Sequence, residues 1–493
     1  MSSTLEFYKQ DFPSTLFPLN TNLILIENYS QELSQYIYEK VINTNISDHS
    51  FLSQQKVFAT KPKNHLRRTV KLDPVAEYFI YDLVYRNRSK FREAVSDNRL
   101  SFGYRFKNGK PITVHEAYEE FKSNVNLFKL IYKHYIKFDI ASYFNCLYHH
   151  DVCHWFSSKG ISQLDSDAFG QFCREINSGR SVDFMPHGIY PSKMIGNEFL
   201  KFIDLNNQLK SEKIIRFMDD FFLFDDDLDV LNKDFIKIQK LIGNFGLNIN
   251  PAKTSLNSDV EEINATLSNV KKTLETIVTI SEECESASGI SIEEIQRKIV
   301  VKLNSNQINQ LLNLLKNEQI EETDAELILS FLRSNSDDVI GVLPNILEKF
   351  PNLIKQVYFL SSTITDKNSL SKILLQHLNS DHFFLEYELF WIAKIVEDFL
   401  LKTPLTGELL IKIFEFSDNY KISQAKILEI PINDFGLKEL RSDFLKTGQS
   451  DWLAWSSAIG SRGLQVAERN YVLDYFSKAS PINYLIASCV KKL

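Results

Sequence analysis

The stretch IIRFMDDFFLF, residues 214–224, sets two adjacent aspartates, Asp219 and Asp220, between two apolar runs. Runs rich in isoleucine and phenylalanine favour buried β-strands. An acidic pair between two such runs predicts a β-hairpin that carries both carboxylates at its turn. An acidic pair of this kind is by itself a weak signal, because an ordinary exposed turn would also carry it.

A second strand is predicted by IKFDI, residues 136–140, in which three apolar residues alternate with Lys137 and Asp139. This period of two gives the strand one apolar face and sets the aspartate near its end. Around the two segments, strand-like and helical runs alternate from about residue 114 to about residue 256, which indicates an α+β fold.

Carboxylates on neighbouring strands suit phosphoryl transfer. Two divalent cations about 3.5–4 Å apart can clamp the attacking and leaving oxygens of such a reaction. Mg²⁺ prefers carboxylate and phosphate oxygens, and strands hold such ligands rigidly. Taken alone, an acidic pair is equally typical of an exposed turn.

Four segments, in order, resemble the motifs of reverse transcriptases. Gly188, Ser192 and Asn197 fit the spacing of the second motif, whereas His187 replaces the usual glutamine and Phe217 the usual tyrosine of the third. Both departures concern templated copying more than catalysis. The segments are FDIASYF (138–144, motif A), PHGIYPSKMIGN (186–197, motif B), FMDD (217–220, motif C) and GLNINPAKT (246–254, the motif D region).

The resemblance implies a metal site for Mg²⁺ or Mn²⁺. Asp139 and Asp219 are expected to bind both ions, with Asp220 as a supporting carboxylate and the Ile140 carbonyl completing the shell. Lys253 is expected to protonate the leaving pyrophosphate, although a surface lysine is the alternative.

Nucleotide binding is implied by the same resemblance. Phe144, five residues after Asp139, is expected to block a ribose 2′-hydroxyl and so favour deoxynucleoside triphosphates; a core aromatic is the alternative. The expected nucleotide-binding set is Phe144, His187, Gly188 and Ser192 of the motifs, with Lys63, Arg67 and Arg68 upstream, where the family's fingers contact the triphosphate.

Charge is distributed unevenly along the chain. The net charge is −7, but residues 51–138 hold 18 lysines and arginines against 8 aspartates and glutamates, a local +10 that leaves −17 elsewhere. This asymmetry predicts one basic surface that binds nucleic acid, with an ordinary solvated face as the alternative.

Composition changes after the motif D region. No aromatic residue lies between Phe245 and Phe331, and the polar segment 281–289 within that gap suits a linker. Beyond it, apolar residues recur at helical spacing. We therefore predict reverse transcriptase fingers and palm over 1–257, a linker over 258–289, and an all-α, HEAT-like helical-repeat domain over 290–493.

A helical region after the palm resembles the abortive-infection (Abi) polymerases of bacteria, AbiK and AbiA among them, and most closely in length their short prophage-borne member. DWLAWSSAIGSR, residues 451–462, resembles a segment late in their helical domain. The resemblance implies untemplated DNA synthesis in defence against phage, closed homo-oligomers, and a single-stranded DNA product covalently attached to a priming tyrosine. Tyr8 is our candidate for that tyrosine.

Two other functions remain open. One is a templated RNA-directed DNA polymerase that copies a partner RNA, and the other is a polymerase-fold scaffold that binds nucleic acid without chemistry. No apolar run approaches the roughly 20 residues of a membrane span, and the first residues lack the pattern of a signal peptide. We expect a bacterial cytoplasmic protein with no membrane partner.

Overall fold

The computed structural model describes residues 3–42, 49–61, 65–91, 96–178, 184–257, 277–286, 289–298, 303–317 and 320–493. The chain divides into two compact units. The first comprises Met1–Ala59, Leu66–Ser258 and Asn419–Leu493, and the second comprises Thr60–His65 and Asp259–Asp418.

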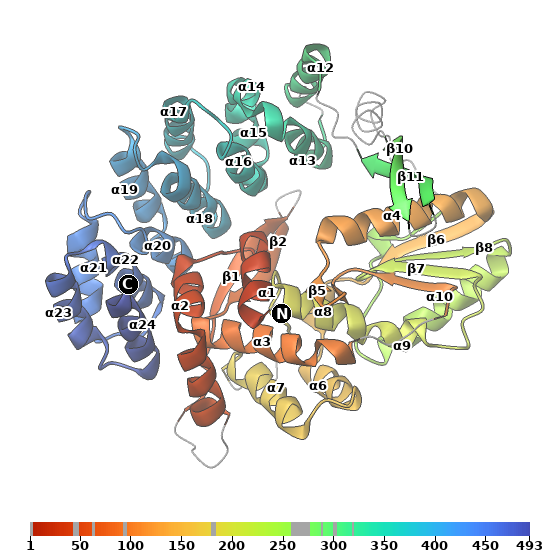
Figure 1. The fold of residues 1–493 in the computed structure, drawn as a ribbon, viewed down its shortest axis with the longest axis horizontal. Helices are drawn as coiled ribbons and strands as arrows, with labels where there is room; N and C mark the ends of the chain where they lie inside the picture. The colour runs from red at the N-terminus through yellow and green to blue at the C-terminus, as the bar shows by residue number, and fades with distance from the viewer. Residues whose placement is uncertain are drawn as a thin grey trace. The chain divides into compact units, whose positions relative to one another are not determined.

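A five-stranded sheet lies at the centre of the chemistry-bearing part of the first unit, with the strand order β3-β7-β8-β6-β9 (Figure 1). β3 runs parallel to β7, and the other neighbours are antiparallel. The hairpin and the second strand predicted from the sequence are its three central strands. The strands are β3 (Arg99–Phe102), β6 (His134–Asp139), β7 (Lys213–Phe217), β8 (Asp220–Asp225) and β9 (Ser255–Leu256).

Each face of the sheet packs against a helix. On one face, α4 (Val114–Ile131) joins an apolar cluster with strand side chains that include Tyr135, Phe222 and Phe224. On the other, Phe138 stacks on Phe221 with ring centroids 5.0 Å apart and touches a phenylalanine of α10 (Leu228–Gly243). These aromatic contacts fix the position and register of the strands that carry the aspartates.

Helices and a hairpin surround the sheet in the rest of the first unit. A two-stranded sheet pairs β1 (Gln55–Lys61) with β2 (His65–Lys71), and a second small sheet pairs β4 (Phe106–Lys107) with β5 (Lys110–Pro111). The remaining helices before the linker region are α1 (Thr4–Asp11), α2 (Asn20–Tyr36), α3 (Pro74–Asn87), α5 (Tyr143–Cys146), α6 (His149–Ser158), α7 (Gln163–Glu175), α8 (Tyr190–Phe199) and α9 (Lys201–Asp204).

Five C-terminal helices also belong to the first unit, and in Figure 1 they lie beside α2. Glu429, which follows α20, accepts hydrogen bonds from the Asn20 and Thr21 amides at 2.9 and 2.7 Å and pairs with Lys426 at 2.6 Å. A carboxylate is stabilising at a helix N-terminus, where backbone N–H groups lack partners. The helices are α20 (Lys421–Leu428), α21 (Leu437–Lys446), α22 (Trp452–Gly460), α23 (Val466–Phe476) and α24 (Pro481–Lys492).

The second unit contains a hairpin and eight helices among its described residues. β10 (Ile277–Ser286) pairs antiparallel with β11 (Gly289–Lys298). The helices are α12 (Ser305–Leu315), α13 (Glu322–Phe331), α14 (Ser336–Val339), α15 (Leu343–Lys349), α16 (Ile354–Ser361), α17 (Lys367–Leu378), α18 (Glu386–Ile395) and α19 (Thr406–Phe416).

The predicted fold class is confirmed: an α+β region is followed by a helical one. The compact units nevertheless differ from the expected division at 257 and 290. The hairpin β10–β11 spans much of the expected linker and enters the region expected to be all-α, and residues 419–493 pack with the N-terminal unit. None of the described helices is both long enough and apolar enough to cross a bilayer.

Glu429→Ala tests the junction between the C-terminal helices and α2. Glu429 and Lys426 are both fully buried, so truncation removes the anion that faces a buried ammonium. We expect the free energy of unfolding to fall by about 3–5 kcal/mol, measured by chemical denaturation. Exposed Glu439→Ala on α21 is the control and should change it by less than about 0.5 kcal/mol. A Glu429→Ala protein as stable as this control would show that the junction contributes little.

Candidate active site

The turn between β7 and β8 has two residues, Met218 and Asp219, because Phe217 pairs directly with Asp220. Met218 has a φ of 58°, in the left-handed region that favours glycine. Two-residue hairpin loops require such a φ at their first position. A methionine there stores strain of about 1–3 kcal/mol, which persists only where the surroundings fix the backbone.

Arg216 fixes that backbone. Its side chain is fully buried, and Nη1 donates to the Met218 carbonyl at 3.2 Å and to Asn197 Oδ1 at 2.8 Å. Nη2 pairs with Asp204 at 2.6 Å. From the other side, the Met218 amide donates to the Phe102 carbonyl at 3.3 Å. The sequence analysis did not single out Arg216, although an arginine inside an apolar strand indicates a buried ion pair.

The strand register brings the three aspartates together. Asp139 on β6 lies directly opposite Asp220 on β8, so both side chains leave the same face of the sheet. The Ile140 amide donates to the Asp219 carbonyl at 3.2 Å, which joins the end of β6 to the turn. The carboxylates thus converge at one end of the sheet, as the alternation of residues predicted.

Burial and mutual repulsion make it unfavourable for all three aspartates to be ionised at once. Burial, then the nearby Asp220 and Asp139 carboxylates, raise the pKa of Asp219 to about 7. Burial likewise raises the pKa of Asp220, with Asp139 adding to the shift and Lys253 opposing it. A carboxylate cluster of this kind is stabilised by bound cations, which offset the repulsion.

Residues 248–253 bring a lysine to the cluster. The Ala141 amide donates to the Asn248 carbonyl and the Asn250 amide to the Asp139 carbonyl, both at 2.8 Å. The Asn250 side chain caps the short 3₁₀-helix η4 (Pro251–Lys253). Lys253 Nζ therefore contacts Asp139 Oδ2 in an ion pair. Burial lowers the pKa of Lys253, but the hydrogen bond and attraction to Asp139 outweigh it and raise the pKa overall.

The donor set fits a divalent cation. Asp139 Oδ1 is buried and has no hydrogen-bond partner among the described residues, which leaves one carboxylate oxygen available in a site of two more carboxylates. Oxygen donors of this type suit Mg²⁺ and Mn²⁺. The Lys253 side chain is 61% exposed, so it can move away from Asp139 without leaving a cavity.

An aromatic pair lies beyond the end of β6. The Phe144 ring contacts the His187 ring edge-on, with centroids 4.6 Å apart. A Cβ added at Gly196 on α8 would lie 2.9 Å from the Phe144 ring, and one at Gly188, whose φ is +97°, would lie 2.5 Å from Leu16. Glycine at both positions lets the motif B segment approach its neighbours closely.

β2 is joined to the same segment. The Thr69 hydroxyl donates to the His187 carbonyl and accepts from the His187 amide, both at 2.9 Å. The sequence analysis did not identify Thr69, because such a contact depends on tertiary structure. Ser192 is fully buried, and its Oγ has no hydrogen-bond partner among the described residues.

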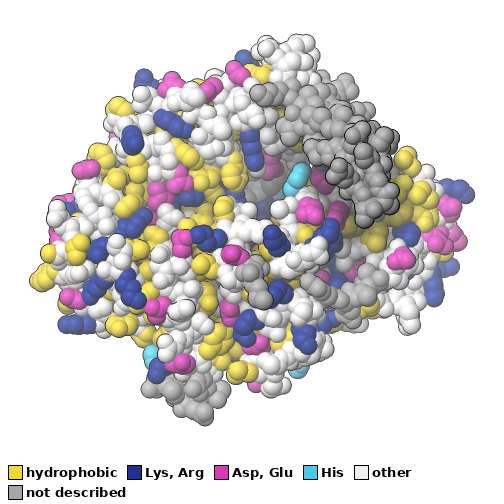
Figure 2. Space-filling view, viewed as in Figure 1, with side chains coloured by type: hydrophobic (Ala, Val, Ile, Leu, Met, Phe, Trp, Pro, Cys, Tyr) yellow, Lys and Arg dark blue, Asp and Glu magenta, His cyan; other side chains and the backbone are white. Residues whose placement is uncertain are grey.

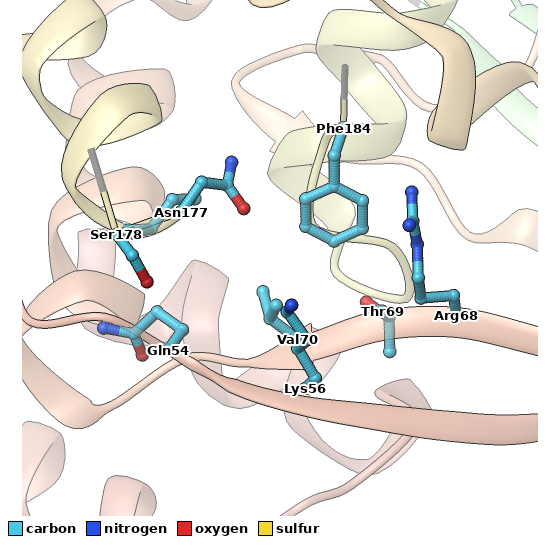
Figure 3. Close-up of a pocket in the computed structure, with 9 residues that line it drawn as sticks. Gln54, Lys56, Arg68, Thr69, Val70, Asn177, Ser178 and Phe184 are labelled. Carbon is cyan, nitrogen blue, oxygen red and sulfur yellow. The ribbon is translucent and has the colours of Figure 1, made fainter. Parts of the chain in front are cut away.

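A pocket of about 190 Å³ lies between the β1–β2 hairpin and the segments after α7. Figure 3 shows the Arg68 side chain beside Phe184 at one end, with Gln54 and Ser178 at the other. The Arg68 guanidinium lies 5.7 Å from the Phe184 ring centroid. Of the other two predicted phosphate-binding cations, Arg67 lies on β2 without lining the pocket and Lys63 falls outside the described residues.

The basic stretch, residues 51–138, contributes cations that are in part paired with anions. Figure 2 shows cationic and anionic side chains interspersed over the visible face. Several cations of residues 51–138 take part in ion pairs, and Lys71 is buried against Glu77. Apart from Asp165, which pairs with Arg86, their partners lie within residues 51–138 and are already counted in the local charge of +10. The paired cations are Lys71, Arg86, Arg105 and Lys107.

A tyrosine that primes synthesis must lie on a mobile or groove-facing segment. Tyr8, the predicted candidate, is instead buried. Its ring is fully buried and packs edge-on against Tyr81, and its hydroxyl donates to Glu77 at 3.2 Å. Burial and the Glu77 charge raise the pKa of Tyr8 well above its usual value, which opposes formation of a nucleophilic phenolate.

Comparison with known proteins identifies the domain that carries this site. Residues 104–319 match the family model described as reverse transcriptase (RNA-dependent DNA polymerase). The match contains all three aspartates and Lys253, so the chain carries a reverse transcriptase domain. No curated protein sequence matches the chain.

Three solved structures show a weak likeness. Apo telomerase from Candida tropicalis is 12% identical, with 87% of this chain and 73% of that chain covered and a TM-score of 0.29. Telomerase from Candida tropicalis with the TWJ fragment of telomeric RNA is 13% identical (79% and 64% covered, TM-score 0.29). Its counterpart from Candida albicans is 12% identical (83% and 69% covered, TM-score 0.27). The domain assignment therefore depends on the family match.

The raised pKa of Asp219 predicts a pH-dependent stability. In the unfolded chain the carboxyl titrates near 3.8, whereas the native carboxyl keeps its proton up to about 7. Since the native state binds more protons in this window, the free energy of unfolding should fall as pH rises from about 4 to about 7. Chelator-treated parent protein should show this slope, and Asp219→Asn should reduce it.

Mg²⁺ should counteract the same repulsion. We expect it to raise the melting temperature, and to do so more at about pH 8 than at about pH 6, because protonated carboxyls do not bind the ion. Exposed Asp229→Asn on α10 serves as the matched control and should behave like the parent. If Mg²⁺ does not change the melting temperature of the parent protein at either pH, the proposed cation site is contradicted.

Proposed function

We propose that the reverse transcriptase domain is an active nucleotidyltransferase that adds deoxynucleotides to a DNA end. The convergence of Asp139, Asp219 and Asp220 carries this proposal, because a buried carboxylate oxygen without a partner and a strongly raised pKa indicate a site built for cations. When bound there, Mg²⁺ or Mn²⁺ neutralises phosphate charge and activates the attacking oxygen.

The residues of the cluster take distinct roles in the proposal. Asp139 and Asp219 bind the ions, Asp220 keeps the local potential negative, and the carbonyl of Ile140, which follows β6, completes the shell. Lys253 holds its proton at Nζ, since the aspartates raise its pKa. It can therefore deliver a proton to the leaving pyrophosphate once it separates from Asp139.

Nucleotide selection is assigned to the aromatic pair and to β2. Phe144 is held by Gly196 and by the His187 ring, so its position is set from two sides. Thr69 fixes the His187 backbone and directly follows Arg68, which lines the adjoining pocket. Arginine suits phosphate oxygens because it donates in a fixed fork. We assign Arg68 to triphosphate binding on this basis, and Arg67 and Lys63 because the resemblance to reverse transcriptases places them in the same segment.

Untemplated synthesis is the first form of the activity that we propose. His187 packs on Phe144, and its backbone is bonded to Thr69. In the sequence motif it stands where reverse transcriptases usually have glutamine, and this difference supports the untemplated form. Templated copying of a partner RNA is the second candidate, favoured by the description of the matching family as RNA-dependent.

Priming by a tyrosine hydroxyl extends the proposal. Priming at Tyr8 requires α1 to leave its contacts with Glu77 and Tyr81. Exposed Tyr471 and Tyr475 on α23 need no such opening. The resemblance to abortive-infection polymerases supports placing this chemistry in phage defence, within a closed homo-oligomer in the bacterial cytoplasm.

The experiment is an incubation of purified protein with labelled deoxynucleotides and Mg²⁺ or Mn²⁺, without primer or template. We expect nuclease-sensitive label on the denatured protein for the parent and the Asp229→Asn control, and loss of at least 100-fold for Asp219→Asn, about 2.7 kcal/mol in the barrier. Peptide mapping of the labelled residue then distinguishes Tyr8 from the tyrosines of α23.

Other outcomes separate the alternatives. Extension that appears only with a primer and an RNA template would replace the untemplated proposal by the templated one. A parent protein that is inactive under both conditions, with either cation, would overturn the assignment of polymerase activity.

Phe144→Ala tests the proposed sugar selection. Removing the ring opens space next to the motif B segment, so ribonucleotides should become substrates. We expect the preference for deoxynucleotides, measured as the ratio of kcat/KM values, to fall about tenfold or more. Phe128→Ala, on the α4 side of the sheet, is the matched control and should leave the ratio unchanged. An unchanged ratio in Phe144→Ala, with activity retained, would assign Phe144 to the core alone.

A further inference from the structure

Two histidines and a glutamate meet in the second unit, within the helical region that the family match leaves almost entirely uncovered. His377 lies at the end of α17, His382 in the connection to α18, and Glu388 in the first turn of α18. His377 Nε2 lies 2.7 Å from Glu388 Oε1, and His382 Nε2 lies 2.8 Å from Glu388 Oε2. One ligand atom from each residue falls within 4.8 Å of the others.

One aromatic ring, Phe384, packs against both histidines of the cluster. Phe384 presents its ring edge-on to His377 and His382, with centroids 5.3 and 4.8 Å apart, and contacts Phe416 of α19 at 5.2 Å. An apolar shell strengthens electrostatic interactions and orients ligands, as it does around known metal centres.

Glu388 gives the cluster a charge that needs a cation. Its side chain is 2% exposed, and burying an isolated carboxylate costs several kcal/mol. Among the described residues, the two carboxylate oxygens of Glu388 each contact one imidazole, that of His377 or that of His382. Either a proton on a histidine or a metal ion bound by all three groups can supply the positive charge. In the second case, a nitrogen of each histidine and an oxygen of Glu388 are the metal ligands.

The chemistry of the donors selects the ion. Imidazole nitrogen suits Zn²⁺ and related transition metals, whereas Mg²⁺ prefers oxygen ligands. Two histidines and one glutamate are a known zinc ligand set, which leaves a fourth position for water. Zinc–nitrogen bonds of about 2.0–2.1 Å require the ligand atoms to move apart by roughly half an ångström, to about 3.3 Å. His382 can make this movement because it lies in a connection and is 25% exposed.

We propose that His377, His382 and Glu388 bind one Zn²⁺ ion, which joins the end of α17 to the start of α18. The ion is structural: it closes the connection between two helices of the second unit and offsets the buried Glu388 charge. The site is separate from the carboxylate cluster of the first unit in its residues and in the ion it selects, and it does not depend on polymerase activity. In the sequence, the site corresponds to HLNSDHFFLEYE, residues 377–388, in which two histidines five residues apart are followed by Glu388.

Zinc binding to the full chain tests the proposal. Chelator-treated protein is titrated with Zn²⁺ in excess Mg²⁺, by calorimetry and by thermal unfolding. We expect one zinc ion per chain and a higher melting temperature in the parent. The same results are expected for Asp219→Asn, which keeps this site, and for His115→Gln, which removes an exposed histidine of α4. His382→Gln should bind at least tenfold more weakly.

A second probe covers variants that fold poorly. Co²⁺ in a tetrahedral site with nitrogen ligands gives visible absorption, which reports coordination directly. We expect this absorption in the parent and its loss in His382→Gln and Glu388→Gln. A parent that binds no Zn²⁺ and gives no tetrahedral Co²⁺ spectrum would overturn the proposal and leave a hydrogen-bonded triad. Zinc binding that His382→Gln leaves unchanged would overturn it equally.

Discussion

Repulsion among three carboxylates at one end of a sheet is the constraint on which the rest of the first unit depends. Strand pairing sets Asp139 opposite Asp220, and a two-residue turn adds Asp219 beside them. Burial prevents water from screening the charges, so the pKa of Asp219 rises to about 7. Such an arrangement persists only because aromatic packing on both faces of the sheet and the buried Arg216 fix the strands.

The same rigid elements extend to the regions that select substrate. Asp139 ends β6, and five residues later Phe144 packs on His187, whose backbone is bonded to Thr69 of β2. A nucleotide that contacts Arg68 and Phe144 would therefore meet groups positioned by one continuous network. The C-terminal helices add support through Glu429, which binds the N-terminus of α2. Preorganisation of this kind favours catalysis, because groups that are already in position do not need to reorganise during the reaction.

Much of this site was predictable from the sequence, because its geometry follows from local periodicity. Alternation along residues 136–140 and the apolar runs around Asp219 determine which side chains share a face. Other features depend on partners distant in sequence. Tyr8 is buried against α3, and Arg86 pairs with Asp165 of α7. The C-terminal helices pack with the N-terminal part through Glu429, Ser456 and Lys492, among other contacts, and no change of composition marks this junction.

The central claim is that the three aspartates bind two divalent cations together with a nucleotide. Titration of the full chain with Mn²⁺, followed by electron paramagnetic resonance in the presence of a non-hydrolysable deoxynucleoside triphosphate, tests it most directly. Two bound ions per chain with mutually broadened signals, and the loss of both in Asp139→Asn, are the result we predict. Mn²⁺ that binds only to the free nucleotide, with the same spectrum for the parent and Asp139→Asn, would contradict the claim.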